Sequence, residues 1–300
     1  MEIEIEGRLR VKINQKDKTS SVIESPKATG TIFVPHFVEH ENENYKIISI
    51  GQSAFENCHI DTLTFAEDSE VETFEKYCFY FAHIKILEIP GSVKKLEDGW
   101  CSFIQDLREI EISPENSHFI LYNEDFVLGK SSESSDKFDV LHFARSDIEE
   151  AVIPPQVTRI KTWSFCSHQR LKTVRFSTNS ELKCIENFAF CRSSIESLSL
   201  PASVEQIGDC CFSNTRNLRK VEISPENKFF KLFEGSFVVK ESRRGSGAFD
   251  AIIFASRDVE SASIPPHIKV INNSAFDYCK RLKIVTFESN SSLESIKTFA

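Results

Sequence analysis

The sequence lacks any long apolar run, and this absence excludes a membrane-spanning helix. Such a helix needs about 20 consecutive, mostly apolar residues, and charged residues interrupt every apolar stretch well before that length. The first six residues alternate acidic and apolar side chains, whereas a secretory leader needs a basic start and an apolar core of about 7–15 residues. We therefore expect neither a transmembrane segment nor a signal peptide in this chain.

The chain also lacks an excess of basic residues. It has 36 Lys and Arg against 45 Asp and Glu, a net charge of −9 at pH 7, and the two signs are mixed along its whole length. Nucleic-acid-binding proteins usually present a basic stripe, because its cations displace counterions from the phosphates. We therefore expect no nucleic-acid partner.

Motifs that would hold a metal or a catalytic group are missing too. His36 and His40 are four residues apart, but they follow Pro35 in an extended stretch and lack the H-E-x-x-H order of zinc proteases. None of the nine cysteines lies in a C-x-x-C pair, and several flank an aromatic residue, which is typical of buried thiols rather than of a disulfide framework. No Ser/His/Asp or Cys/His constellation recurs. The sequence predicts no cofactor, no metal and no enzymatic activity.

Phenylalanine is abundant where other large residues are scarce. There are 26 Phe against one Met, two Trp and five Tyr, which indicates one packing position filled repeatedly. Seven of these Phe residues follow a small residue or Cys in similar contexts, and we expect them to stack as an interior ladder. They are Phe55, Phe79, Phe103, Phe165, Phe190, Phe212 and Phe276.

Two nested repeats organise the chain. Residues 107–189 align without a gap with residues 218–300, at an offset of 111, so that the Ser113–Asn116 box recurs as Ser224–Asn227. Within this long unit, apolar triplets such as Leu87-Glu88-Ile89 recur every 23 or 24 residues. Repeats of 20–29 residues around a short alternating strand are typical of a leucine-rich repeat solenoid. We expect each turn to hold a β-strand, often ended by Pro, and a short helical or irregular segment, in a right-handed coil.

Two intervals of 41 residues interrupt this spacing, from Ile112 to Ile153 and from Ile223 to Ile264. Each contains two apolar stretches around a polar tip, residues 131–136 in the first and 243–247 in the second. This pattern predicts a β-hairpin insert in each long repeat. The Ser-Pro-Glu-Asn boxes are interpreted as turns that follow a strand.

The outward side chains of the strands are the best candidates for a binding face, because solenoids bind partners on the concave sheet. One predicted row is Thr64, Glu88, Glu111, Val152, Arg175, Ser199, Glu222, Ser263 and Thr286. The neighbouring row is Thr62, Ile86, Glu109, Glu150, Thr173, Ser197, Lys220, Ser261 and Ile284. Glu88, Glu109, Glu111 and Glu150 are predicted to form an acidic patch for a basic protein, with Arg175 and Glu222 as further candidate binding residues; a merely solvated face is the alternative.

Several of these segments resemble a known family. Ile50–Cys58 is similar to the I-G-x-x-A-F-x-x-C core of BspA-like leucine-rich repeat surface antigens, and Leu200–Gly208 to the family's I-P-x-S-V-x-x-I-G element, as is Ile89–Val93 to its first half. The resemblance extends from about residue 30 to residue 300. It implies a cell-surface or secreted adhesin that binds a host matrix or cell-surface protein. The alternative is a cytosolic scaffold that recruits an intracellular protein.

We predict an N-terminal β-rich cap at residues 1–29 and a solenoid at residues 30–300, with long repeats at 107–217 and 218–300. The second long repeat is truncated, since Ala300 directly precedes position 301, where the repeat would place a Phe. Solenoids need a terminal cap, so we expect the chain to be a fragment, with any surface anchor beyond it.

Overall fold

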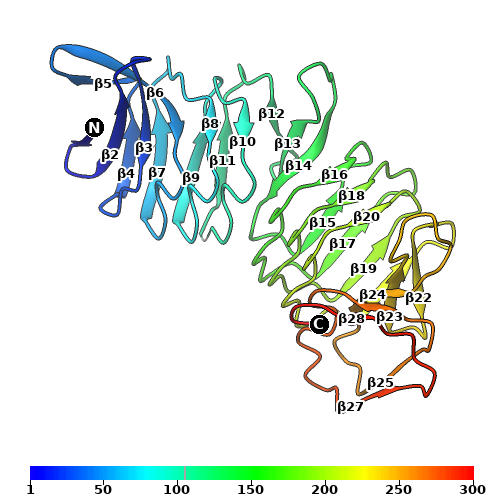
Figure 1. Cartoon of the computed structure of the whole chain (residues 1–300). Helices are drawn as coiled ribbons and strands as arrows, with labels where there is room; N and C mark the ends of the chain where they lie inside the picture. The colour runs from blue at the N-terminus through cyan, green and yellow to red at the C-terminus, as the bar shows by residue number, and fades with distance from the viewer. Residues whose placement is uncertain (105) are drawn as a thin grey trace. The chain divides into compact units, whose positions relative to one another are not determined.

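The computed structural model describes residues 1–104 and 106–300, which divide into two compact units, Met1–Ser146 and Asp147–Ala300. Within the described residues there are 28 strands and no helix. Each unit is a β-solenoid whose short strands lie side by side from one turn to the next (Figure 1). Of the helical or irregular segment expected in each turn, the helical form is absent from the described residues, whereas the leucine-rich repeat solenoid is confirmed.

The turns of the first unit are formed by two sheets, one on each side of the solenoid. The first is a parallel sheet in the order β11-β9-β7-β4. Its strands are β4 (Thr29–Val34), β7 (His59–Phe65), β9 (His83–Ile89) and β11 (Glu109–Ile112). The second sheet continues through β6 (Glu43–Ile50), β8 (Thr73–Phe74) and β10 (Lys95–Leu96), with β5 (Phe37–His40) antiparallel to β6.

An antiparallel ribbon precedes the first turn. It consists of β1 (Glu2–Ile5), β2 (Leu9–Asn14) and β3 (Thr19–Ile23), and β3 joins the second sheet by pairing parallel to β6. Leu9, Val11 and Ile13 alternate with half-buried or exposed residues and are buried in the core of the first unit. Period-two burial of this kind is expected of a strand with one face on the core.

The second unit repeats the two-sheet arrangement. One parallel sheet has the order β15-β17-β19-β21, with β15 (Glu150–Ile153), β17 (Thr173–Phe176), β19 (Ser197–Leu200) and β21 (Lys220–Ile223). Opposite lie β16 (Arg159–Ile160), β18 (Cys184–Ile185) and β20 (Gln206–Ile207). The last turns contain β25 (Ser261–Ile264), β26 (Val270–Ile271), β27 (Ile284–Phe287) and β28 (Ser295–Ile296); all residues of β27 and β28 are exposed.

Both predicted hairpin inserts are confirmed, and each gains a third strand. In the first unit β13 (Phe126–Lys130) pairs with β14 (Phe138–Ala144), and β12 (Phe119–Tyr122) adds to the outer side of β13. In the second unit β22 (Phe230–Phe233), β23 (Phe237–Lys240) and β24 (Ala251–Ala255) make the same antiparallel meander. The division into a cap at 1–29 and a solenoid at 30–300 stays a prediction.

The Ser-Pro-Glu-Asn boxes are turns, as predicted, and their Asn residue does more than turn the chain. Buried Asn116 donates from Nδ2 to the carbonyls of Pro90 (2.8 Å) and Val93 (3.0 Å) in the preceding turn. Its Oδ1 accepts from the backbone N–H groups of His118 (2.9 Å) and Phe119 (2.8 Å). This side chain therefore replaces backbone hydrogen bonds at the point where the insert leaves the solenoid.

Asn227 makes the same four hydrogen bonds in the second unit. Its Nδ2 donates to the carbonyls of Pro201 and Val204, and its Oδ1 accepts from the N–H groups of Phe229 and Phe230, all at 2.9–3.0 Å. Both inserts are thus attached to the solenoid in the same way.

The segment between the two strands of a turn is a series of tight turns with left-handed residues four apart. Positive φ values occur at Ser53 and Asn57, and again at Tyr77 and Phe81, although none of these residues is Gly. Backbone hydrogen bonds to the next turn compensate for this conformation, for example from Phe55 N–H to Cys78 C=O (2.8 Å). This hydrogen-bonded ladder takes the place of the helix.

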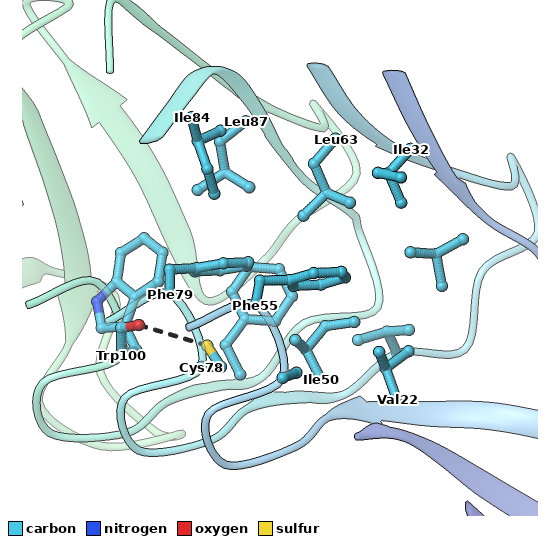
Figure 2. Packing of buried hydrophobic residues seen from close by; sticks show 14 of the residues in the cluster. Val22, Ile32, Ile50, Phe55, Leu63, Cys78, Phe79, Ile84, Leu87 and Trp100 are labelled. Atoms are coloured by element: carbon cyan, nitrogen blue, oxygen red, sulfur yellow. Dashed lines mark hydrogen bonds between the residues drawn. The ribbon is translucent and has the colours of Figure 1, made fainter. Parts of the chain in front are cut away.

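The interior is a stack of aromatic rings from successive turns. Phe55 and Phe79 are parallel, with ring centroids 5.7 Å apart, and Trp100 packs edge-on against Phe79 at 6.0 Å (Figure 2). Cys78 lies beneath these rings and donates to the Trp100 carbonyl at 3.4 Å. Offset-stacked and edge-to-face contacts of this kind add to the gain from burial.

The predicted Phe ladder is correct in part. In the second unit Phe165, Phe190 and Phe212 stack with centroids 5.0 and 6.0 Å apart. Phe103, however, stacks on Phe81 at 4.7 Å and is not in the row of Phe55 and Phe79. The ladder position of that turn belongs to Cys101, since the N–H of Phe79 bonds to the carbonyl of Trp100.

Candidate protein-binding face

The candidate face is the outward side of the parallel sheet β4-β7-β9-β11 in the first unit. Leu63, Leu87 and Ile110 point into the core, so the residues beside them point outward. Glu111 lies opposite Glu88, and Glu109 lies opposite Ile86. The register of each pairing places these residues in the rows expected from the sequence.

Three carboxylates gather on this face, at Glu88, Glu109 and Glu111. Glu109 and Glu111 are exposed, and Glu88 is half-buried and accepts a hydrogen bond from the Phe65 N–H at 3.0 Å. Within residues 1–104 and 106–300, no Lys, Arg or His side chain lies at ion-pair distance from any of the three. We call this set the acidic triplet.

The equivalent positions of the second unit are neutralised. At the 111-residue offset, Glu109 corresponds to Lys220, Glu111 to Glu222 and Glu88 to Ser199. Lys220 Nζ lies 2.6 Å from Glu222 Oε1, and Ser199 Oγ donates to Glu222 Oε2 at 2.9 Å. These hydrogen bonds, that from Lys220 first, lower the pKa of Glu222. Two copies of one structural element thus carry different charge.

Glu150 does not extend the acidic triplet. It lies on β15 of the second unit, where its Oε1 is 2.5 Å from Arg175 Nε. Arg175 and Glu150 thus compensate each other. Of the six candidate residues, three are compensated by neighbours within the second unit and three form the acidic triplet of the first.

One exposed residue of this face was missing from the predicted rows. Phe33, on β4, lies opposite Thr64 and is 56% exposed. Its triplet, Ile32-Phe33-Val34, has the same alternation as the others, with Ile32 and Val34 buried. Extending the triplet pattern one turn toward the N-terminus would have found it.

Of the two histidines considered for metal binding, His36 contacts two carboxylates and His40 lies 3.6 Å from Glu41. His36 Nδ1 lies 2.6 Å from Asp68 Oδ2, and its Nε2 lies 3.2 Å from Glu70 Oε1. The hydrogen bond with His36 lowers the pKa of Asp68, and that from Lys46, with a smaller contribution from His36, lowers the pKa of Glu70. In the described part of the chain no three His, Cys, Asp or Glu residues form a group that could hold a metal.

All nine cysteines are free thiols, and seven of them are buried. Burial raises the pKa of Cys58 to about 11 and those of Cys78 and Cys101 well above the ordinary value. Cys191 is the exception, since a hydrogen bond with Cys166 lowers its pKa. Buried thiols of high pKa are poor nucleophiles and act as small apolar residues.

The architecture defines a class: repeat proteins in which each turn buries its apolar residues only against its neighbours and presents a row of outward side chains. The chain matches the model of the BspA type leucine rich repeat region in six copies, over residues 38–124, 138–238 and 248–300. It therefore belongs to the BspA-type leucine-rich repeat family. No helix long and apolar enough to cross a bilayer occurs among residues 1–104 and 106–300.

Crystal structures of bacterial leucine-rich repeat proteins resemble this chain. The pneumococcal vaccine antigen PcpA is 19% identical to this chain with a TM-score of 0.51, and the match covers 100% of this chain and 67% of the PcpA chain. A leucine rich cell surface protein from Faecalibacterium prausnitzii is 19% identical with a TM-score of 0.48, covering 99% and 72%. A leucine-rich repeat protein from Eubacterium ventriosum is 14% identical with a TM-score of 0.49, covering 99% and 90%. A search of curated proteins gave no match.

Proposed function

We propose that this chain is a protein-binding module of a bacterial cell surface, and that its acidic triplet binds a basic segment of a partner protein. The family is one of repeat proteins, and the similar structures include a protein named as a cell surface protein and one named as a vaccine antigen. These likenesses support the surface location. By family resemblance, the partner is a host matrix or cell-surface protein.

The acidic triplet itself is the observation that carries the proposal. Like charges directly opposite each other on neighbouring strands destabilise a sheet. Glu88 and Glu111 are such a pair, and Glu109 adds a third charge on the same strand as Glu111. Cations of a bound partner would relieve this repulsion, whereas in the second unit Ser199 stands in place of Glu88 and Lys220 compensates Glu222.

The chain offers a matched control for testing this face. Glu111→Lys and Glu222→Lys change the same residue type, at the same position of the long repeat, by the same net charge. A fluorescent decalysine peptide, titrated at low and at physiological salt, serves as the basic probe. We expect Glu111→Lys to weaken binding about tenfold and Glu222→Lys less than about twofold. Equal losses of affinity in the two variants would mean that decalysine binding depends only on the net charge of the chain, and would overturn the proposal.

A cytosolic scaffold is the second candidate, and the nine free thiols favour it. Structural disulfides are common in exported proteins and rare where glutathione keeps thiols reduced. In that case the same acidic triplet would bind an intracellular basic protein. Surface labelling of intact cells separates the two locations.

A further inference from the structure

A groove lies in the second unit where the parallel sheet meets the insert. Its volume is about 1030 Å³, and its floor is formed by the ends of β17, β19 and β21. The half-buried Phe176 and Ile223 contribute apolar surface to this floor, the buried Leu200 lies between them, and Leu232 of β22 contributes to the wall. Leu232 is 40% exposed. The groove is thus apolar at its base and open to solvent along one strand of the insert.

Two strand edges without a partner border this groove. In the described residues of the second unit, β22 is the outermost strand of its sheet, and β21 is the outermost strand of the sheet β15-β17-β19-β21. The next strand of that side, β25, begins a separate two-stranded sheet with β27. The insert therefore interrupts the parallel sheet at β21 and leaves main-chain donors and acceptors unpaired there.

The direction of the peptide groups on β22 follows from one hydrogen bond. The N–H of Phe230 donates to Asn227 Oδ1 at 2.9 Å, so it points away from β23. Peptide groups alternate in direction along an antiparallel strand, so the N–H and C=O of Leu232 also point outward. An extended chain beside β22 would find both a donor and an acceptor at this residue.

The charges along the groove indicate which kind of peptide it can bind. Glu222 is neutralised by Lys220 at 2.6 Å, and Lys231 directs its ammonium group over the ring of Phe249, 4.0 Å from the centroid. Glu226 is exposed, and it has no ion-pair partner within the described residues. A single uncompensated carboxylate beside an apolar floor complements a segment with apolar side chains and one cation.

We propose that this groove binds an extended peptide segment of a partner protein by strand addition to β22. Main-chain hydrogen bonds to Leu232 fix the peptide, alternate apolar side chains of the peptide cover Phe176 and Ile223, and a Lys or Arg of the peptide lies opposite Glu226. β22 has four residues and spans roughly 13 Å, so about four to six peptide residues are bound. This site deepens the proposed protein-binding role, but it uses a surface of the second unit, separate from the acidic triplet.

The test begins with a phage-displayed library of random ten-residue peptides, panned against the whole chain. We expect enrichment of sequences that alternate apolar and polar residues and carry a Lys or Arg. A synthetic, fluorescent copy of the most enriched peptide is then titrated against variants. Failure to enrich any such pattern overturns the proposal.

The variants separate main-chain from side-chain recognition. Leu232→Pro removes the outward N–H, and a strand edge tolerates Pro where the N–H faces solvent; we expect at least a tenfold loss of affinity. Leu232→Ala keeps the N–H and should lose about threefold, and Glu226→Gln about fivefold. Should Leu232→Pro fail to fold, slower hydrogen exchange of the Leu232 amide in the peptide complex of the unmodified chain replaces it. Unchanged affinity in Glu226→Gln and Leu232→Ala, or an unprotected Leu232 amide, overturns strand addition.

Glu111→Lys distinguishes this proposal from the one above. It should weaken decalysine binding and leave the selected peptide unaffected, because Glu111 is in the first unit and the groove is in the second. Loss of the selected peptide in Glu111→Lys, with no effect of Leu232→Ala, would assign the peptide to the acidic triplet instead.

Discussion

Replacing Asn116 or Asn227 with Ala should destabilise one unit each, because one side chain makes four buried hydrogen bonds. Both residues are 7% exposed, and all eight bonds measure 2.8–3.0 Å. A typical intramolecular hydrogen bond contributes about 1 kcal/mol net, and a buried group left unpaired costs more. Each substitution therefore lowers the free energy of unfolding by about 4 kcal/mol, since four bonds are lost together.

Native-state hydrogen exchange can show which segment each replacement destabilises. Asn116→Ala should accelerate exchange in residues 116–122 and leave 227–233 unchanged, and Asn227→Ala should do the reverse. For a unit of about 150 residues the midpoint of thermal unfolding should fall by roughly 8–16 °C. Glu115→Ala and Glu226→Ala are the controls, because these exposed neighbours should change stability by less than about 0.5 kcal/mol.

Asn116→Asp tests which half of the side chain matters. It keeps the acceptor for the N–H groups of His118 and Phe119 but loses both donors, and it sets a carboxylate against the carbonyls of Pro90 and Val93. We expect it to be at least as destabilising as Ala at pH 7. A loss below about 1 kcal/mol in both Asn116→Ala and Asn227→Ala would refute the claim that these residues attach the inserts.

Three further predictions concern an arginine and a glutamate of the second unit, and the thiols. Arg257 is 4% exposed and donates to the carbonyls of Phe212 (2.9 Å), Ala255 and Ala275 (3.2 Å each), so Arg257→Ala should cost about 3 kcal/mol in urea unfolding, whereas Arg243→Ala at the exposed insert tip should change little. Burial alone would raise the pKa of Glu186, but Lys161 and Arg159 outweigh it and the pKa is lowered. The stability from this charge is therefore present above the unfolded pKa of about 4.3 and is lost as pH falls through the lower folded value, so Glu186→Gln should flatten the acid limb of a stability profile below about pH 5, and an unchanged slope would contradict this. Native alkylation at pH 8, followed by mass spectrometry, should modify the half-buried Cys184 and Cys210 before the seven buried thiols; early labelling of Cys78 or Cys101 would show that the aromatic stack opens.

Much of the fold could be predicted because the repeat imposes a register. Triplets such as Leu87-Glu88-Ile89 fix which residues point inward, and Pro90, Pro154, Pro201 and Pro265 follow the strands directly, as expected of a residue that cannot donate to a sheet. The polar tips of the inserts were equally clear. Local periodicity was sufficient for these features, since each depends on neighbours within one turn.

Features that depend on contacts between turns were not predictable in this way. Tyr77 and Phe81 have positive φ, which local preference disfavours for bulky residues, and hydrogen bonds to the next turn maintain it. Phe103 follows Cys101-Ser102 and resembles a ladder residue, but Trp100 fills the volume beside Phe79. The sequence likewise identifies Asn116 only as a turn residue, because its hydrogen bonds to the carbonyls of Pro90 and Val93 depend on the packing of the preceding turn.

The candidate face was predictable in position but not in charge balance. The rows of outward residues follow from alternation, whereas compensation depends on side-chain geometry. Glu222 and Glu150 have Lys220 and Arg175 beside them, and Glu109 and Glu111 have no such partner in the described part of the chain. The replacement of Glu88 by Ser199 and of Glu109 by Lys220 is visible in the sequence, whereas the contacts that compensate Glu150 and Glu222 appear only in the structure.

Surface labelling tests the central claim, a surface-exposed protein-binding module, most directly. An antibody against this chain is applied to intact cells that produce it and, in parallel, to permeabilised cells. The account predicts labelling of intact cells, with a signal that protease treatment of the cell exterior removes. Labelling that occurs only after permeabilisation would contradict it and leave the cytosolic scaffold as the function of the chain.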